Sequence, residues 1–264
     1  MKYILTILVF LVSLKAPSPE QDPAFQSGEW FKFKMSYSGW FKAGEATLKV
    51  DEKKLNGKTV YHVVGKGKTT GAVNLFFKVR DRYESYFDKE TGAPYKFIRK
   101  IDEGGHTKDI EIEFNHEEQK AVVNNKKHKK VKTIATEEDV QDMVSMYYYL
   151  RNSINIDELK IGDEIKTNMF FDEENYGFKL KYLGKETIKV DVNDSKVKVK
   201  SLKFRPYVMA GRVFKEEESL TLWVSADKNK IPLKIKADLA VGSLRADLVQ
   251  FKGLKHYFPI VFDN

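Results

Sequence analysis

Hydrophobic and polar residues alternate with a period of two along most of the chain. Between residues 29 and 37 the large apolar side chains fall on one face and the lysines on the other, the apolar set being Phe31, Phe33, Met35 and Tyr37. Because successive side chains of a strand point to opposite faces, this pattern predicts a half-buried β-strand. Similar patterns predict strands over residues 45–50, 60–64, 78–87, 95–101, 109–114, 121–123, 164–171, 176–183, 186–192, 196–204, 219–224, 231–237 and 244–251.

Turn-forming residues separate these predicted strands. Asn56–Gly57, for example, is typical of a two-residue hairpin turn, because both residues tolerate a positive φ angle. Short strands at this spacing favour an all-β, mainly antiparallel fold. A flat open sheet of about 13–15 strands would leave long unpaired edges, so the sequence predicts a large, partly open β-barrel or a curved meander.

One segment, residues 136–151, has the spacing of an amphipathic helix instead. Thr136 is a candidate N-cap, three acidic residues follow it, and apolar side chains recur every three or four residues from Val140 to Leu150. This central helix either covers one mouth of the curved sheet or marks the joint between two β-halves. No long linker divides the rest of the chain, so we predict a single barrel-like domain over residues 28–264.

The N-terminal segment differs from the rest of the chain. A basic start is followed by an apolar run of 11 residues, 4–14. A helix of that length spans about 16 Å, which is too short to cross a membrane and typical of a secretory signal. We predict a signal peptide at 1–16, a flexible linker at 17–27, and export to the periplasm or cell envelope. No cysteine follows the apolar run and no later stretch has membrane-spanning length, so neither a lipid anchor nor a transmembrane span is expected in the mature chain.

Composition and charge narrow the classes of function. Hydrophobic residues make up 42% of the chain, enough for a packed core, and the absence of cysteine excludes thiol catalysis and cysteine-ligated metals. The formal net charge of +8 falls by two if Lys2 and Lys15 leave with the signal peptide. A modest positive charge favours anionic lipids or glycans. The aromatic residues follow strand alternation rather than forming a stacking surface, so no nucleic-acid partner is predicted.

Motifs of known chemistry are incomplete in this sequence. The run Gly65–Thr70 resembles a phosphate-binding loop, but His62 stands where its first glycine belongs and a strand pattern follows. The histidines lack metal-ligand spacing, so no metal site, no cofactor and no catalytic residues are predicted. The acidic runs 172–174 and 216–218 leave one enzymatic alternative, an envelope glycan hydrolase with two facing carboxyl groups.

Two sets of residues are candidates for binding. A basic cluster predicted at a hairpin tip would either protect a sheet edge or contact phosphate-bearing lipid or another anionic surface; it comprises Lys126, Lys127, Lys129, Lys130 and Lys132. Large aromatic side chains would either fill the interior of the curved sheet or line an apolar cleft for an acyl chain. The candidate cleft residues are Phe31, Phe33, Trp40, Tyr83, Phe97 and Trp223.

Three short motifs stand out when they are taken in order along the chain. They are Phe25-x-x-Gly28-Glu29-x-Phe31-x-Phe33 near the start, a helical motif from Asp139 to Arg151, and Leu222-Trp223-Val224-Ser225-x-Asp227 near the end. Together they resemble an exported bacterial family, the domain of unknown function 3108 (DUF3108), and the likeness covers roughly residues 25–254. The resemblance implies a periplasmic protein with a YmcC-like, partly open antiparallel barrel. It implies no catalytic residues.

These observations lead to three hypotheses about function. We expect a non-enzymatic envelope protein that holds an apolar or amphipathic ligand, such as a lipid or glycolipid, or a protein partner, on a concave β-sheet. The first alternative is a structural or assembly component of an envelope or polysaccharide-export complex that acts through protein–protein contact. The second is the glycan hydrolase. Because fold likeness does not establish function, the choice depends on the geometry of a site.

Overall fold

The computed structural model of the protein describes residues 22–209 and 220–260, and the predicted signal peptide at 1–16 lies outside these residues. Within them the chain forms two helices, α1 (Val73–Phe76) and α2 (Met143–Ser153). The strands are β1 (Trp30–Tyr37), β2 (Phe41–Leu55), β3 (Lys58–Thr69), β4 (Arg80–Phe87), β5 (Pro94–Glu103), β6 (His106–Asn115), β7 (Lys120–Asn125), β8 (Lys130–Ala135), β9 (Glu164–Phe171), β10 (Glu174–Val192), β11 (Ser195–Met209), β12 (Leu220–Ser225), β13 (Pro232–Asp238) and β14 (Ser243–Lys252).

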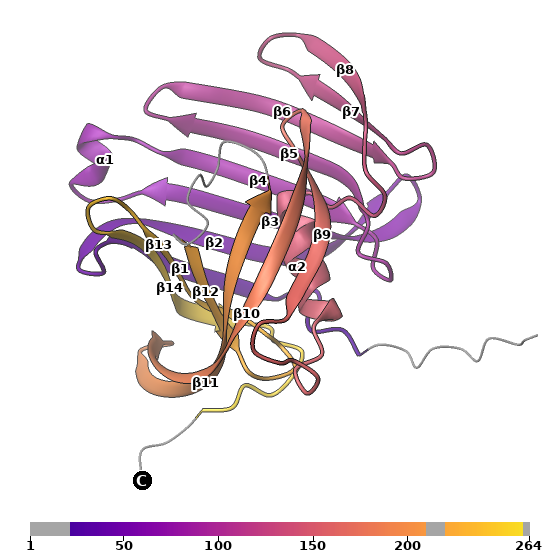
Figure 1. Ribbon diagram of the computed structural model, residues 1–264. Helices are drawn as coiled ribbons and strands as arrows, with labels where there is room; N and C mark the ends of the chain where they lie inside the picture. The colour runs from indigo at the N-terminus through magenta and orange to yellow at the C-terminus, as the bar shows by residue number, and fades with distance from the viewer. Residues whose placement is uncertain (1–21, 210–219, 261–264) are drawn as a thin grey trace, which may run out of the picture.

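The described strands belong to one antiparallel sheet of 14 strands (Figure 1). Their order is β8-β7-β6-β5-β4-β3-β2-β1-β14-β13-β12-β11-β10-β9, so the two halves of the chain join where β1 pairs with β14. The sheet is not closed, and β8 and β9 form its edges. This arrangement confirms the predicted all-β class, the number of strands and the open, barrel-like architecture.

Two strands differ from the predicted pattern. Alternation does not predict β8, because nearly all of its side chains are exposed and apolar residues do not mark one face. β10 is a single strand of 19 residues where the sequence predicts two. Near its middle Gly184 has a φ angle of +128° at a shift of register with β11. Such a bulge lets a strand bend without ending.

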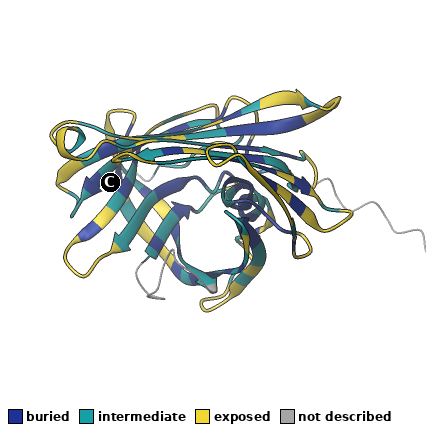
Figure 2. Ribbon diagram, turned by 90° about the horizontal axis from the view of Figure 1, so that it is seen from above, coloured by how far each residue is buried: buried dark blue, intermediate teal, exposed yellow. Residues whose placement is uncertain are grey.

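The sheet curves around α2. Figure 2 shows a broad layer of strands with the rest of the sheet curving beneath it and α2 enclosed between them. The helix contributes Val144 and Tyr148 to one buried cluster and Met146 and Leu150 to a second. Of the two predicted positions for this helix, the structure therefore supports the joint between two β-halves.

The start of the helix was predicted too early, at Thr136. The helix begins at Met143, and the N-cap is Asp142, whose carboxylate accepts hydrogen bonds from the backbone N–H groups of Val144 and Ser145 at 2.7 and 2.8 Å. The preceding acidic run forms a turn in which Asp139 has a φ angle of +51°. The helix starts where a side chain satisfies its free N–H groups, and a negatively charged sequence alone does not fix that point.

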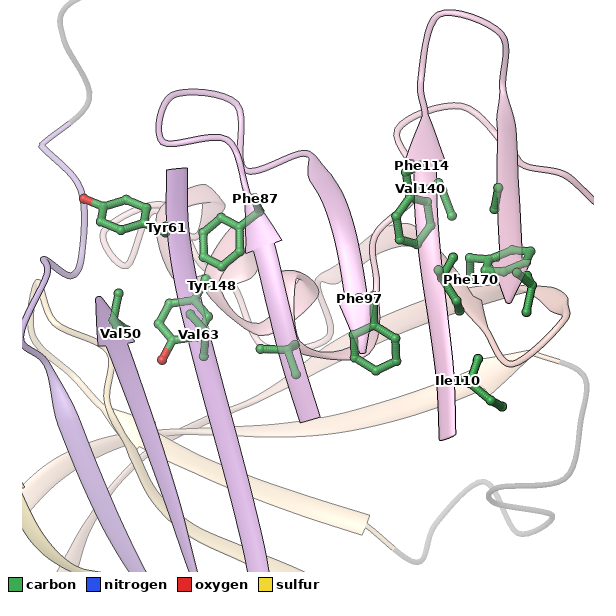
Figure 3. Packing of buried hydrophobic residues seen from close by; sticks show 14 of the residues in the cluster. Val50, Tyr61, Val63, Phe87, Phe97, Ile110, Phe114, Val140, Tyr148 and Phe170 are labelled. Carbon is green, nitrogen blue, oxygen red and sulfur yellow. The ribbon is translucent and has the colours of Figure 1, made fainter. Parts of the chain in front are cut away.

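The inner face of the sheet carries a row of buried residues, apolar except for Ser85, that crosses six strands. Adjacent strands bring these residues opposite one another in register: Val50, Val63, Ser85, Phe97, Ile112 and Val123. Figure 3 shows side chains of this cluster projecting from neighbouring strands toward α2. Burying each large apolar side chain contributes about 1.5–3 kcal/mol, so this row provides much of the force that curves the sheet around the helix.

The predicted linker at 17–27 is wrong in its last part. Phe25 is only 2% exposed, and its ring lies 5.0 Å from that of Tyr61 and 4.6 Å from that of Tyr148. The Ala24 N–H donates to Asn152 Oδ1 at 2.9 Å. Burying an aromatic ring lowers the free energy of the folded state. The segment therefore packs between β3 and α2 despite its nearby prolines.

Candidate functional site

The strand register places a row of cations on the outer face of the sheet. Lys32, Thr47, Lys66, Arg82 and Lys100 lie directly opposite one another on β1 to β5. Residues next to this row on β1, β2 and β4 enter the core, among them Phe31, Leu48 and Tyr83, so the row is turned away from the core. Four of its five side chains carry a positive charge.

A second row runs parallel to the first, two residues along each strand. It contains Glu45, Lys68 and Arg80. Between the rows the surface is hollowed into a groove of about 620 Å³, which Trp30 and Gln250 also line. We call this the cationic groove and define it by Lys32, Lys66, Lys68, Arg80, Arg82 and Lys100.

Three acidic residues, Glu45, Asp81 and Asp102, line the groove with its six cations and neutralise part of this charge. Glu45 pairs with Lys32 at 3.1 Å, and the hydrogen bond from that lysine holds the pKa of the carboxyl below its usual value. Lys66 and Lys68 are exposed and have no ion pair within the part of the chain that the structure describes. The groove therefore has positive charge available for an anionic ligand.

A buried polar cluster holds Arg82 in the groove. Glu84 accepts hydrogen bonds from the Arg82 Nε at 2.7 Å and lies 2.7 Å from the His62 Nε2. Burial would raise the pKa of Glu84, but the bonds from Arg82 and His62 outweigh it and the pKa is lowered. The His62 ring stacks on Tyr86 at 4.1 Å. These contacts fix the direction of a guanidinium that would otherwise move freely on the surface.

A second polar cluster lies inside the sheet, at the start of α2. The buried Asp142 accepts a hydrogen bond from Ser85 Oγ at 2.6 Å in addition to the capping bonds. Burial raises the pKa of Asp142 to about 6 although its hydrogen bonds act in the opposite direction. The hydrogen-bond partners of this carboxyl belong to β4 and to the first turn of α2, so the cluster positions α2 against β4.

A buried ion pair joins distant parts of the chain near the C-terminal end of α2. Arg151 donates to both carboxylate oxygens of Glu29 at 2.6 and 2.7 Å, and both side chains are buried. The Arg151 Nε also donates to the Asn229 carbonyl at 2.9 Å, and the guanidinium lies 5.3 Å from the Phe25 ring. Both charged groups are saturated by these partners, so the pair is a structural anchor.

This anchor is where the sequence motifs converge. Glu29 belongs to the first motif, Arg151 to the helical motif, and Asn229 follows the last motif by two residues. The family model for "Protein of unknown function (DUF3108)" matches residues 32–249. The chain belongs to the DUF3108 family. The resemblance expected from the motifs is thereby confirmed.

A solved structure outside the DUF3108 family has a fold similar to that of this chain. The chain is similar to a β-barrel-like protein of the DUF1849 domain from Brucella abortus, with a TM-score of 0.54 and 10% identity over 88% of this chain and 100% of that one. Another similar structure is a protein from Bacteroides fragilis, provisionally described as exported and as having a YmcC-like fold; it has a TM-score of 0.34 and 8% identity over 86% and 97% of the two chains. The likeness to the DUF1849 structure concerns the fold alone.

No curated protein matches the sequence of this DUF3108 member. Neither α1 nor α2 is long and apolar enough to cross a membrane, and these are the helices of the described ranges. Nothing in the family or among the structural neighbours indicates catalysis. A function must therefore be argued from the site itself.

The five predicted lysines do not form one free cluster. Lys126 bonds to Glu111, Lys127 donates to the Thr107 carbonyl at 2.9 Å, and Lys132 pairs with Glu173. The expected hairpin tip ends at Lys129, because Lys130 and Lys132 already belong to the edge strand β8. Lysines on an open edge hinder pairing with another chain, which agrees with the edge-protecting role considered for them.

The six predicted cleft residues are separated in the structure. Phe31, Phe33 and Phe97 are packed in buried clusters, and Tyr83 is partly buried beside Phe97. Trp223 lies between Lys203 and Lys234, with its indole N–H bonded to Glu186. Trp40 is 80% exposed at the β1–β2 turn, so its prediction as an inward-facing residue is wrong. A turn residue has no strand neighbour to direct its side chain inward.

Two carboxylates of the acidic run 172–174 form ion pairs with lysine and arginine side chains. Asp172 pairs with Arg99 at 2.6 Å and Lys108 at 2.5 Å, and Glu173 pairs with Lys132. Burial would raise the pKa of Asp172, but the hydrogen bonds from Lys108 and Arg99 outweigh it and lower the pKa. A general acid requires the opposite shift. The second acidic run, 216–218, lies outside the described residues.

Sequence reasoning missed the cationic groove, although one signal for it was present. The Gly65–Thr70 run lacks the first glycine of a phosphate-binding loop and favours a strand instead, and in β3 it places Lys66 and Lys68 on the same outer face. Alternation within one strand could have shown this pair. Their convergence with Lys32, Arg82 and Lys100 could not be found that way, because strand order and register align these residues.

Proposed function

We propose that this protein is a non-enzymatic cell-envelope protein that binds an anionic amphipathic ligand, a lipid or glycolipid, in the cationic groove. The observation that carries the proposal is the pair Lys66 and Lys68, exposed and unpaired in a groove with four further cations. A phosphate or carboxylate head group would find several charge-assisted donors within one site. The expected signal peptide at 1–16 would direct the protein to the cell envelope.

The groove replaces the concave face as the proposed binding surface. The concave side of the sheet holds α2 and buried aromatic residues such as Phe97 and Phe204. The outer groove is open and offers mixed chemistry, because Trp30 lines it beside the lysines. A ligand with a charged head and an apolar part fits such a lining better than a wholly apolar one.

Binding of a soluble short-chain lipid tests the proposal. Dihexanoyl phosphatidylglycerol, kept below its micelle concentration, is titrated against the mature protein and compared with dihexanoyl phosphatidylcholine. The groove variant is Lys66→Glu with Lys68→Glu. A matched control is Lys185→Glu with Lys189→Glu, which changes the same charge at two exposed positions of β10.

We expect the anionic lipid to bind more tightly than the neutral one. The groove variant should lose about tenfold or more in affinity, since two charge-assisted contacts disappear, while the control variant binds as the wild type does. Equal affinity for the two lipids, or equal loss in both variants, would show that the groove is not the binding site.

A further inference from the structure

One end of the sheet gathers five turns that far-apart segments contribute. They comprise residues 38–40, 70–79, 104–105, 126–129 and 239–242. Hydrogen bonds tie neighbouring turns together: Ser38 N–H donates to the Ser243 carbonyl at 2.6 Å, and Thr70 N–H to the Ala43 carbonyl at 3.1 Å. Figure 1 shows α1 and the β13–β14 turn at this same end of the sheet. We call these five turns the apolar rim.

Large apolar side chains project into solvent from three of these turns. The exposed fractions are 80% for Trp40, 81% for Leu75, 89% for Phe76 and 78% for Val241. The short helix α1 buries none of its residues, so it presents Leu75 and Phe76 outward. Isolated exposed apolar residues are ordinary, but several from separate turns at one end of a molecule mark an interaction surface.

The charge of the rim indicates which surface it contacts. Its five turns contain no aspartate or glutamate, and their charged residues are Lys78, Lys126, Lys127 and Lys129. The charged strand residues that adjoin these turns include Lys42, Glu103 and Asp238, the last of which pairs with Lys236. The β9–β10 turn at the same end carries Asp172 and Glu173, but both carboxylates are paired with cations. An apolar tip surrounded by lysines is complementary to a bilayer with anionic head groups.

The opposite end of the sheet has the reverse character, and we call it the acidic end. It comprises the turns 88–93, 116–119, 155–163, 193–194 and 226–230. Their acidic residues are Asp88, Glu90, Glu117, Glu118, Asp157, Glu158, Asp163, Asp194 and Asp227. Residues 22–29 and 253–260 also lie there, since Gly28 bonds to Val50 and Asn229 to His256. The described chain ends therefore lie away from the apolar rim.

We propose that the apolar rim docks on an anionic lipid bilayer and inserts Trp40, Leu75, Phe76 and Val241 at the boundary between head groups and acyl chains. Aromatic residues favour this boundary, and the rim lysines would contact lipid phosphates. Arg80, at the end of the cationic groove, follows the α1 turn directly. Docking would bring the groove close to the lipid head groups. The inference goes beyond ligand binding in the groove and does not require it.

Vesicle binding by the mature protein tests this inference. Large vesicles of phosphatidylglycerol and phosphatidylethanolamine are compared with vesicles of phosphatidylcholine by co-sedimentation, and tryptophan emission is recorded in parallel. The rim variant is Trp40→Ser with Phe76→Ser. The control variant is Ile161→Ser with Tyr257→Ser, which removes two side chains of similar exposure, 77% and 82%, from the acidic end.

We expect the wild type and the control variant to sediment with the anionic vesicles, with a blue shift of the wild-type emission. The rim variant should partition about tenfold less per lost side chain, because each insertion buries a large apolar surface. Retained vesicle binding by the rim variant would overturn the inference. Failure of the wild type to bind either kind of vesicle would also overturn it. In that case, a dimer in size-exclusion chromatography that the rim variant cannot form would identify a second copy of the chain as the partner of the rim. Short-chain lipid monomers probe the groove separately, so failure of one proposal is distinguishable from failure of the other.

Discussion

The two ends of the sheet are made from the same strands but differ in what their turns contain. At the acidic end the turns carry most of their charge as carboxylates, and the buried pair of Arg151 and Glu29 ties α2, the residue before β1 and the β12–β13 turn together. At the apolar rim the turns expose Trp40 and Phe76, and α1 buries nothing. Strand residues must satisfy packing on both sides, whereas turn residues are free of that constraint. Contacts that stabilise the fold are therefore concentrated at the acidic end, and exposed apolar side chains at the apolar rim.

Breaking the buried ion pair should have the largest effect on this division. Arg151→Met leaves the buried carboxylate of Glu29 without its partner, so the free energy of unfolding should fall by about 3–5 kcal/mol. Urea denaturation measures the loss. The double variant Glu29→Gln with Arg151→Met should lose less than the two single variants together, because it leaves no unpaired charge. Additive losses would show that the two groups do not act as a pair.

Protonation of Asp142 should give a smaller, pH-dependent effect. Its pKa is raised from 3.8 to about 6 in the fold, so the folded carboxyl holds a proton more tightly than the unfolded one. This group therefore stabilises the fold fully below pH 4 and loses its contribution, on the order of 3 kcal/mol, as the pH rises through about 6.

Denaturation between pH 4 and pH 7.5 checks this prediction in the variant Asp142→Asn, which keeps a capping oxygen but cannot titrate. The difference in stability between wild type and variant should shift toward the wild type as the pH falls. Asp139→Asn, at a turn residue with a positive φ angle that asparagine tolerates, is the matched control for replacing a carboxylate by an amide outside the cap. A pH-independent difference would contradict the raised pKa.

Substitutions at the apolar rim should have the smallest effect on stability. Trp40→Ser with Phe76→Ser removes two side chains that contact mainly solvent, so the free energy of unfolding should change by no more than about 0.5 kcal/mol. The same urea experiment measures it. A loss comparable to that of Arg151→Met would mean that the rim is part of the core, and the contrast between the two ends would then be lost.

Alternation predicted most strands because one-sided burial imposes it. The predicted segment 164–171 coincides with β9, and the Asn56–Gly57 turn has the positive φ angles expected of it. The failures occurred where burial does not shape the pattern. β8 is mostly exposed, Trp40 belongs to a turn, and Phe25 packs against residues that are distant in sequence.

The sequence by itself determined the class of fold, the approximate number of strands and the family, because strand period, turn residues and motif order are local properties of the chain. Only the tertiary structure decided which charged side chains lie together in the groove and which apolar side chains lie together at the rim. Lys32, Lys66 and Lys100 share one groove because β1, β3 and β5 pair through β2 and β4 in a fixed register. Trp40 and Val241 share one rim because β1 pairs with β14. Such contacts depend on the pairing of distant strands, and hydrophobic burial selects that pairing across the whole sheet.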